Sequence, residues 1–321
     1  MEKKDLKIVF FGTPDFAVES LKRLVEGGYN VVGVVTMPDK PAGRGHHLLQ
    51  SDVKKYAVEN GLHLMQPVKL KDEEFVNELR SLNADLFIVI AFRMLPEVVW
   101  AMPRLGTFNL HASLLPKYRG AAPINWAVMN GETETGVTTF FLKHEIDTGD
   151  VIQQKSLPIG RKDNVETIHD GLMMMGAGMV IETVDAIIAG TVKPIPQSEM
   201  LTAGEKPTSA PKIFKDTCRI DWNWCAEKVY NHVRGLSPYP AAWTEIVDAA
   251  GKVYAVKIFE TGEPEAPSAN LVPGNLTTDG KRLWVVCADA KIEILSLQMA
   301  GKRRMPTADF LRGFNIEGCH C

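Results

Sequence analysis

The sequence has few cysteines, no long apolar run and no excess of charge of one sign. Among its 321 residues are five cysteines, and the notable apolar runs fall short of the ~18 residues that a membrane span needs. With 36 basic and 39 acidic residues, the formal net charge is −3. We therefore expect no membrane segment, and any contact with a nucleic acid has to come from a local patch rather than from overall charge.

The amino-terminal segment does not have the pattern of a secretion signal. It is basic, but the apolar run that follows, residues 8–11, is too short for the core of a signal peptide. An odd number of cysteines without a secretory context favours reduced thiols. These features predict a cytoplasmic protein.

Length and hydrophobic pattern indicate an α/β fold in the first part of the chain. The length suits about two domains, and the 45% hydrophobic content suffices for a core. Continuous apolar runs alternate with amphipathic stretches, which predicts a mostly parallel, Rossmann-like sheet with helices on both faces. Active sites in such sheets lie beyond the carboxyl ends of the strands. We expect strands near residues 7–11, 29–36, 85–92 and 106–111, and helices near 16–27, 53–60, 72–82 and 165–189.

The pattern changes after the expected helix at residues 165–189. A proline-rich stretch follows, which is typical of a linker. Beyond it, short strand-like runs separated by glycine and proline predict a small β-barrel of the OB type. We expect a catalytic domain over 1–189, a linker over 190–208 and a barrel domain over 209–321.

Asn109 and His111 form the first candidate site. In a strand, residues two apart point to the same side, so both side chains project together. An amide beside a protonated imidazole suits a place where negative charge develops on an oxygen. The alternative is that both are polar residues at a strand end, satisfied by nearby backbone.

Asp147 adds a carboxylate to this candidate site. It begins an Asp-Thr-Gly loop between two expected strands, residues 138–142 and 151–153. A carboxylate there would orient His111 and keep an imidazolium available near neutral pH. The alternative is an Asx turn, in which Asp147 merely caps its own loop.

Four segments, taken in order, resemble the folate-dependent formyltransferases. They are residues 11–17 (Phe-Gly-Thr-Pro-Asp-Phe-Ala), Asn109-Leu-His111, residues 113–120 (Ser-Leu-Leu-Pro-Lys-Tyr-Arg-Gly) and Asp147-Thr-Gly149. The resemblance covers nearly the whole chain and indicates the branch that formylates methionyl initiator tRNA. It implies 10-formyltetrahydrofolate as donor, the α-amino group of methionine as acceptor, and Asn109, His111 and Asp147 as catalytic residues.

The resemblance also implies binding residues for both substrates. A folate site would be formed by Ser113, Leu114, Leu115 and Pro116, together with Phe92, Arg93 and Leu95 at another strand end, where backbone groups meet the pterin. For Leu95, core packing is the equal alternative. Contacts with tRNA would come from Lys40, Gly43, Arg44 and Gly45 in a long loop, and from Lys212 in the second domain. The chain has His46 and His47 where relatives often carry lysines.

Several other functions remain as alternatives. An enzyme that formylates an amino sugar on a nucleotide would share the three catalytic residues, whereas an RNA- or folate-binding protein would lack turnover. A nicotinamide enzyme is disfavoured because the GxGxxG pattern is absent after Phe11. We expect no metal, since the Cys319-His320-Cys321 tail lacks a suitable partner pair, and we expect a monomer.

Overall fold

The computed structural model describes residues 2–42, 47–201, 204–266 and 272–321. The chain forms two compact units, and each is built from several separate segments. The first contains residues 1–120, 135–157 and 169–209, and the second contains residues 121–134, 158–168 and 210–321. The two units interleave along the chain. The expected boundaries at residues 189 and 209 therefore stay predictions.

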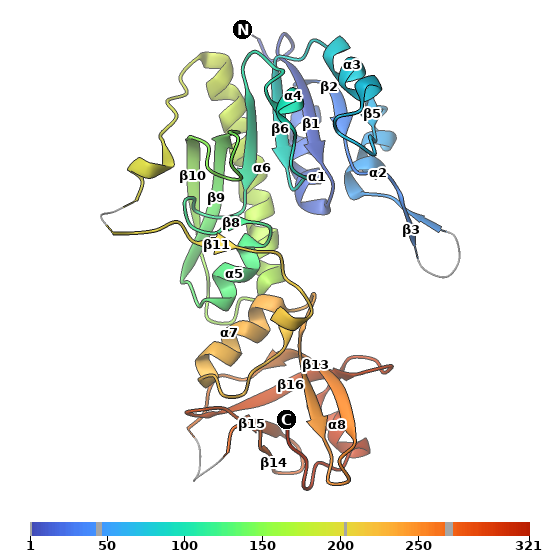
Figure 1. Cartoon of the computed structure of the whole chain (residues 1–321), viewed down its shortest axis with the longest axis vertical. Coiled ribbons are helices and arrows are strands. Elements are labelled where there is room, and N and C mark those ends of the chain that lie inside the picture. Colours follow the sequence, from blue (N-terminus) through green and yellow to red (C-terminus); the bar gives the residue numbers. More distant parts are fainter. Residues whose placement is uncertain (1, 43–46, 202–203, 267–271) are drawn as a thin grey trace. The chain divides into compact units, whose positions relative to one another are not determined.

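A seven-stranded sheet forms the centre of the first unit (Figure 1). The five strands β5, β2, β1, β6 and β7 run parallel to their neighbours, and β9 pairs antiparallel with β7. In order across the sheet the strands are β10 (Val151–Pro158), β9 (Glu134–Phe141), β7 (Thr107–His111), β6 (Leu86–Ile90), β1 (Lys7–Gly12), β2 (Asn30–Val35) and β5 (Leu64–Met65).

Helices cover this sheet because alternate strand residues bury apolar side chains on either face. On one face, Phe75 and Leu79 of α3 pack with Phe11 and Phe87. On the other, Gly176 of α6 lies directly against Leu110. The helices of this unit are α1 (Asp15–Glu26), α2 (Asp52–Glu59), α3 (Glu73–Ser81), α4 (Glu97–Trp100) and, from residue 169 onward, α6 (Val165–Ala189).

Helix α6 is long and apolar enough, by length and composition alone, to cross a membrane. The expectation of no such segment therefore overlooked it. Its apolar character has a structural use in the first unit, where Leu172, Met179, Val180 and Val184 are buried. The sequence shows no continuous apolar run of that length here, because Asp170, Glu182 and Asp185 interrupt it.

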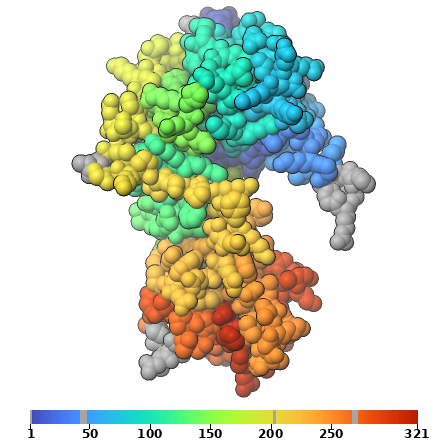
Figure 2. All heavy atoms as spheres, in the orientation of Figure 1, coloured from blue at the N-terminus to red at the C-terminus, as the bar shows by residue number. Residues whose placement is uncertain are grey.

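Two small two-stranded sheets accompany the seven-stranded sheet. One is a hairpin of β3 (Lys40–Ala42) and β4 (His47–Leu49), where the sequence predicted an irregular loop. The other joins β8 (Arg119–Gly120) to β11 (Ser209–Ala210). The expected linker also contains a 3-10 helix, η1 (Gln197–Glu199). In the space-filling view this yellow segment lies against green residues of the same unit (Figure 2).

The second unit is an antiparallel sheet curled around a core that α7 (Ala226–Leu236) covers. Its strand order is β12 (Ala242–Val247), β13 (Val253–Thr261), β16 (Lys291–Met299), β15 (Leu283–Val286) and β14 (Leu276–Thr278), and β17 (Met305–Pro306) pairs with β16. The remaining elements are α5 (Pro123–Met129), η2 (Asp216–Cys218) and α8 (Thr307–Gly313).

The carboxyl-terminal tail links the two edges of this curled sheet. His320 forms backbone bridges with Val247 at the end of β12 and with Asn275 beside β14. The sheet is therefore a half-barrel that the tail closes, because each edge finds backbone partners in the same extended residue. The predicted class, a mostly parallel α/β domain followed by a small barrel-like domain, is confirmed.

Candidate active site

Asn109 and His111 lie at the carboxyl end of β7, beside the ends of two other parallel strands. Gly12 of β1 is level with Ile90 of β6, which is level with Leu110 of β7. This register places the polar strand end at the edge of the sheet where α/β enzymes bind ligands. Among the described residues no hydrogen-bond partner is found for the Asn109 amide, so it is available to a substrate oxygen.

The two ring nitrogens of His111 have different neighbours. Its Nε2 lies 2.8 Å from the carbonyl oxygen of Tyr118, and a carbonyl only accepts, so Nε2 carries a proton. Its Nδ1 faces Oδ2 of Asp147 at 3.8 Å, beyond hydrogen-bond distance. The ring is 7% exposed. Held this way, the ring turns Nδ1 toward a carboxylate that lies just beyond direct hydrogen-bond distance.

Asp147 is held by a distant residue rather than by its own loop. Its Oδ2 accepts a hydrogen bond from the backbone N–H of Gly120 at 2.9 Å. The Asx-turn alternative does not describe this contact. Asp147 has φ 56° and Tyr118 has φ 61°, so the residues at both ring nitrogens of His111 adopt the left-handed conformation. Such strain persists where the surrounding structure enforces it, often at functional sites.

Gly149 shows how tightly the Asp147 loop is packed. A Cβ at this position would lie 1.6 Å from the carbonyl oxygen of Phe141. Only glycine fits at that position unless the backbone moves. The Asp-Thr-Gly pattern signalled a loop, but it gave no sign of this close approach.

Residues 113–116 form a turn that is held by hydrogen bonds with the side chains of Thr138 and Gln154. The hydroxyl of Thr138 donates to the carbonyl oxygen of Ser113 at 2.7 Å and accepts from the N–H of Leu115 at 3.2 Å. Gln154 donates to the carbonyl oxygen of Leu115 at 2.6 Å. Ser113 and Leu115 are buried, and Leu114 is partly exposed. Thr138 and Gln154 were missed because nothing local marks them as partners of this turn.

The strand end at residues 92–95 offers backbone rather than side chains. Phe92 stacks edge-on against Phe11 at 5.8 Å and Leu95 is buried. The Arg93 guanidinium donates to the carbonyl oxygens of Pro67 and Val68, and burial lowers its pKa. Among the described residues, no acceptor is found for the backbone N–H groups of 92–95. These amides are therefore available to a planar polar ring.

The predicted tRNA loop is partly outside the described residues. Lys40 is exposed on β3, whereas Gly43, Arg44 and Gly45 lie in the segment that the structure does not describe. Asp39, at the base of the hairpin, binds Lys54 at 2.6 Å and Gln66 at 2.9 Å. These two hydrogen bonds, that of Lys54 first, lower the pKa of Asp39. The base of the hairpin is therefore anchored to the first unit.

Lys212 lies in an exposed basic stretch of the second unit. Its ammonium is 5.7 Å from the centre of the Phe214 ring, and that ring is 63% exposed. Lys215 lies over Trp243, while Arg219 is paired with Glu245 at 2.8 Å. Lys212 beside the exposed Phe214 ring combines charge for phosphates with a surface for stacking.

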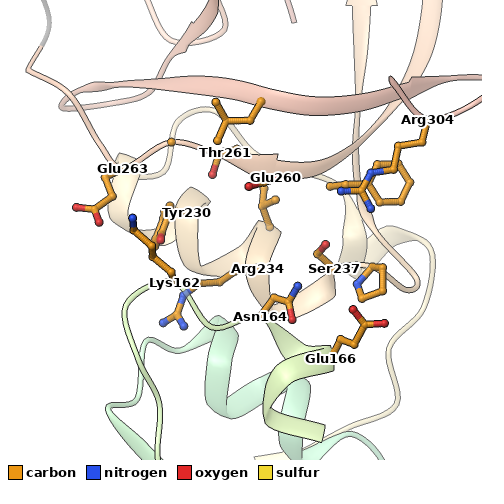
Figure 3. A pocket seen from close by; sticks show the side chains of 15 residues that line it. Lys162, Asn164, Glu166, Tyr230, Arg234, Ser237, Glu260, Thr261, Glu263 and Arg304 are labelled. Carbon is orange, nitrogen blue, oxygen red and sulfur yellow. The ribbon is translucent and has the colours of Figure 1, made fainter. Parts of the chain in front are cut away.

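A cavity of about 540 Å³ lies elsewhere in the second unit (Figure 3). None of the three candidate catalytic residues lines it. Lys162 and Glu263 lie on one side, and Arg304 and Glu166 on the other. Basic and acidic groups alternate in this lining, so the cavity has no excess positive charge for a phosphate.

The cysteines do not form a metal centre among the described residues, where no cluster of three metal-ligating side chains is found. All five thiols are free. Burial raises the pKa of Cys287 and of Cys321 to about 12, so both remain protonated thiols at neutral pH. The tail at residues 319–321 has a structural role in closing the half-barrel.

A free amide, a buried imidazole and a carboxylate at the end of a parallel sheet are groups suited to acyl-type transfer. Two family models match this chain: "Formyl transferase" over residues 6–184, and "Formyl transferase, C-terminal domain" over residues 212–315. The chain therefore belongs to the formyl transferase family.

The chain is similar over nearly its whole length to methionyl-tRNA formyltransferases of bacteria. The methionyl-tRNA formyltransferase of Bacteroides fragilis is 64% identical over 318 residues, covering 98% of this chain and 97% of the relative. That of Porphyromonas gingivalis is 50% identical, with 98% of each chain covered. An N-formyltransferase from Helicobacter canadensis, solved with folinic acid and dTDP-3-aminofucose, matches with a TM-score of 0.64 over 90% of this chain and 98% of its own. Its 19% identity shows a shared fold alone.

Proposed function

We propose that this protein transfers the formyl group of 10-formyltetrahydrofolate to the α-amino group of methionyl initiator tRNA, giving formylmethionyl-tRNA for translation initiation. The observation that carries this proposal is the 64% identity to a methionyl-tRNA formyltransferase over 98% of the chain. The identity extends through both family domains, and sugar N-formyltransferases of similar fold share only about a fifth of their residues with this chain.

The chemistry follows from the arrangement around His111. The methionyl amine attacks the formyl carbon, and a tetrahedral oxyanion forms. The free amide of Asn109 and the Nδ1–H of protonated His111 donate hydrogen bonds to this oxyanion. The C–N bond to the folate then breaks, and the proton lost by the amine passes to the departing folate nitrogen. Asp147 stabilises the positive charge of the His111 imidazolium and orients the ring for this transfer.

Folate binding is assigned to two backbone-rich segments. The turn of Ser113, Leu114, Leu115 and Pro116 is rigid because Thr138 and Gln154 satisfy its polar groups. The segment of Phe92, Arg93 and Leu95 contributes free amides, whereas its side chains pack inward or clamp the Pro67–Val68 carbonyls. Backbone groups at fixed positions recognise a planar pterin without needing a charged side chain.

Contacts with tRNA are assigned to two basic regions. Lys40, Gly43, Arg44 and Gly45 belong to the hairpin, where glycines beside an arginine allow close approach to phosphates. Lys212 is part of the exposed stretch that also contains Phe214. We expect the protein to act as a cytoplasmic monomer, and the monomer is tested by sedimentation of the purified chain.

The decisive experiment is transfer of labelled formyl from 10-formyltetrahydrofolate to methionyl initiator tRNA, with an amino sugar nucleotide as a parallel acceptor. Formylmethionyl-tRNA as the product supports the proposal. Formylation of the sugar alone would retain the chemistry but refute the tRNA acceptor. Folate binding without transfer to either acceptor would refute the enzyme assignment.

A further inference from the structure

Gln197 connects the segment between the two family domains to the Asp147 loop. It lies in η1, within the stretch that the sequence predicted to be a simple linker, and is 3% exposed. Its Nε2 donates to the carbonyl oxygens of Asp147 and Gly149, both at 2.8 Å. Its Oε1 accepts from Nε and Nη2 of Arg119, at 3.0 and 2.7 Å.

These four hydrogen bonds use the full capacity of the amide. A glutamine has two N–H donors and one oxygen with two lone pairs, and all are engaged. The orientation of the amide follows from chemistry, because a guanidinium only donates and a backbone carbonyl only accepts. A side chain that is buried and fully bonded in this way holds its partners in one geometry.

The bonds form a closed ring around Asp147. Gly120 donates its N–H to the Asp147 carboxylate, and its neighbour Arg119 binds Gln197, which in turn binds the Asp147 carbonyl. Backbone and side chain of Asp147 are therefore fixed separately. This double attachment explains how a non-glycine residue remains at φ 56°.

The same segment is anchored on either side of Gln197. Ile195 and Val151 exchange two backbone hydrogen bonds, of 2.8 and 2.9 Å. Thr208 accepts the backbone N–H of Arg119 at 2.9 Å. Residues 195–197 thus lie beside the strand that follows the Asp147 loop, and Thr208 lies beside the residue that binds Gln197.

We propose that Gln197 is a positioning residue for formyl transfer. It holds Asp147 where the carboxylate faces His111, so the segment between the two family domains contributes to the geometry of the active site. The proposal rests on the proposed function, since it concerns the rate of that reaction. Gln197 contacts no reacting atom and acts only through Asp147. A displacement of about 1 Å at a reacting group can lower a rate about a hundredfold.

Three variants test this role. Gln197→Met keeps the length of the side chain but removes all four hydrogen bonds. Gln197→Glu keeps the acceptors for Arg119, but it turns a carboxylate oxygen toward the carbonyls of Asp147 and Gly149. Thr183→Val is the matched control, because Thr183 is equally buried in the same unit and its hydroxyl bonds to Thr139 at 2.9 Å, away from Asp147.

We expect both Gln197 variants to lower kcat by about 10- to 100-fold while KM for folate and for tRNA changes less than about threefold. Thr183→Val lowers the melting temperature without lowering kcat. A Gln197 variant that is folded by circular dichroism and keeps kcat within about twofold of wild type would overturn the proposal.

A double-mutant cycle distinguishes the loss of positioning from a general loss of stability, because it measures whether the effects of Gln197 and Asp147 on kcat are coupled. In an Asp147→Asn background, Gln197→Met should change kcat by less than about twofold, because the group it positions has already lost its charge. A full multiplicative loss in that background would overturn the proposal. The wild-type assay separates the two hypotheses: no formylation by wild-type protein refutes the proposed function, whereas active wild type with unaffected Gln197 variants refutes only the positioning role.

Discussion

His111 donates its Nε2–H to the carbonyl oxygen of Tyr118 over 2.8 Å, and this hydrogen bond fixes the orientation of the ring. With Nε2 committed to the backbone, Nδ1 is the nitrogen that faces Asp147. The carbonyl thus fixes the orientation of the ring, and Nδ1 is left as the nitrogen that the proposed mechanism uses when the ring is protonated.

Substitution at either oxyanion donor should therefore affect turnover rather than folding. We expect Asn109→Ala and His111→Gln to lower kcat by about 100- to 1000-fold, because each removes one donor from the developing oxyanion. His111→Gln retains an N–H group for Tyr118 but cannot carry a positive charge. Single-turnover formylation measures the loss, and Asn77→Ala on the exposed face of α3 is the control. Near-normal turnover in a folded variant would refute the assigned role.

Gly149 gives a steric test of the Asp147 loop. A Cβ there would lie 1.6 Å from the Phe141 carbonyl oxygen, so Gly149→Ala must displace the backbone. We expect kcat to fall at least about a hundredfold and the free energy of unfolding to fall by about 1–3 kcal/mol. In Gly178→Ala, the nearest atom to the new Cβ is the flexible Arg23 guanidinium at 3.3 Å. That control variant should keep both quantities near wild type, and equal losses in the two variants would contradict the steric argument.

Much of the first unit could be predicted because its strands are continuous apolar runs. Residues 7–11 and 106–111 were expected as strands and form β1 and β7, and helix α6 has the expected bounds of 165–189. The β3–β4 hairpin was missed, since a proline and two glycines indicated irregular structure and its pairing depends on residues on both sides of the loop.

The side chains of the candidate site could be predicted from the sequence, but the residues that hold them in position could not. Asn109, His111 and Asp147 were marked by residue type and by order along the chain. Gln197 was not, because it lies 50 residues beyond Asp147 in a proline-rich stretch without periodicity. Its role depends on a tertiary contact that no local pattern encodes. The sequence therefore predicts which groups react, whereas the contacts that hold these groups appear only in the folded structure.

The exposed basic stretch of the second unit should affect tRNA more than folate. We expect the double variant Lys212→Gln, Lys215→Gln to raise KM for tRNA by about threefold to tenfold and to weaken its dependence on salt concentration, since two phosphate contacts are lost. KM for folate should stay unchanged. Lys281→Gln, an exposed lysine in the turn between β14 and β15, is the control. Equal increases in both KM values would contradict a tRNA-specific role.

His232 makes the stability of the second unit depend on pH. The ring lies on α7, is 6% exposed, and its Nε2 is buried with no hydrogen-bond partner among the described residues. Burial lowers the pKa of His232 from 6.5 to about 4. Between these values the unfolded chain binds a proton that the folded chain excludes. Stability is therefore lost as the pH falls from 6.5 toward 4, by about 3 kcal/mol in total.

The variant His232→Phe tests this dependence, because phenylalanine keeps a ring against Trp224 but does not titrate. At pH 7 it should be less stable than wild type, since it loses the backbone hydrogen bond to Cys218. At pH 4 the difference in the free energy of unfolding should have shifted by about 3 kcal/mol in favour of the variant. Urea unfolding at pH 7, 5.5 and 4 measures this difference, and other titrating groups cancel because both proteins contain them. A difference that stays constant over this range would show that the folded protein accepts a proton at His232 as readily as the unfolded chain.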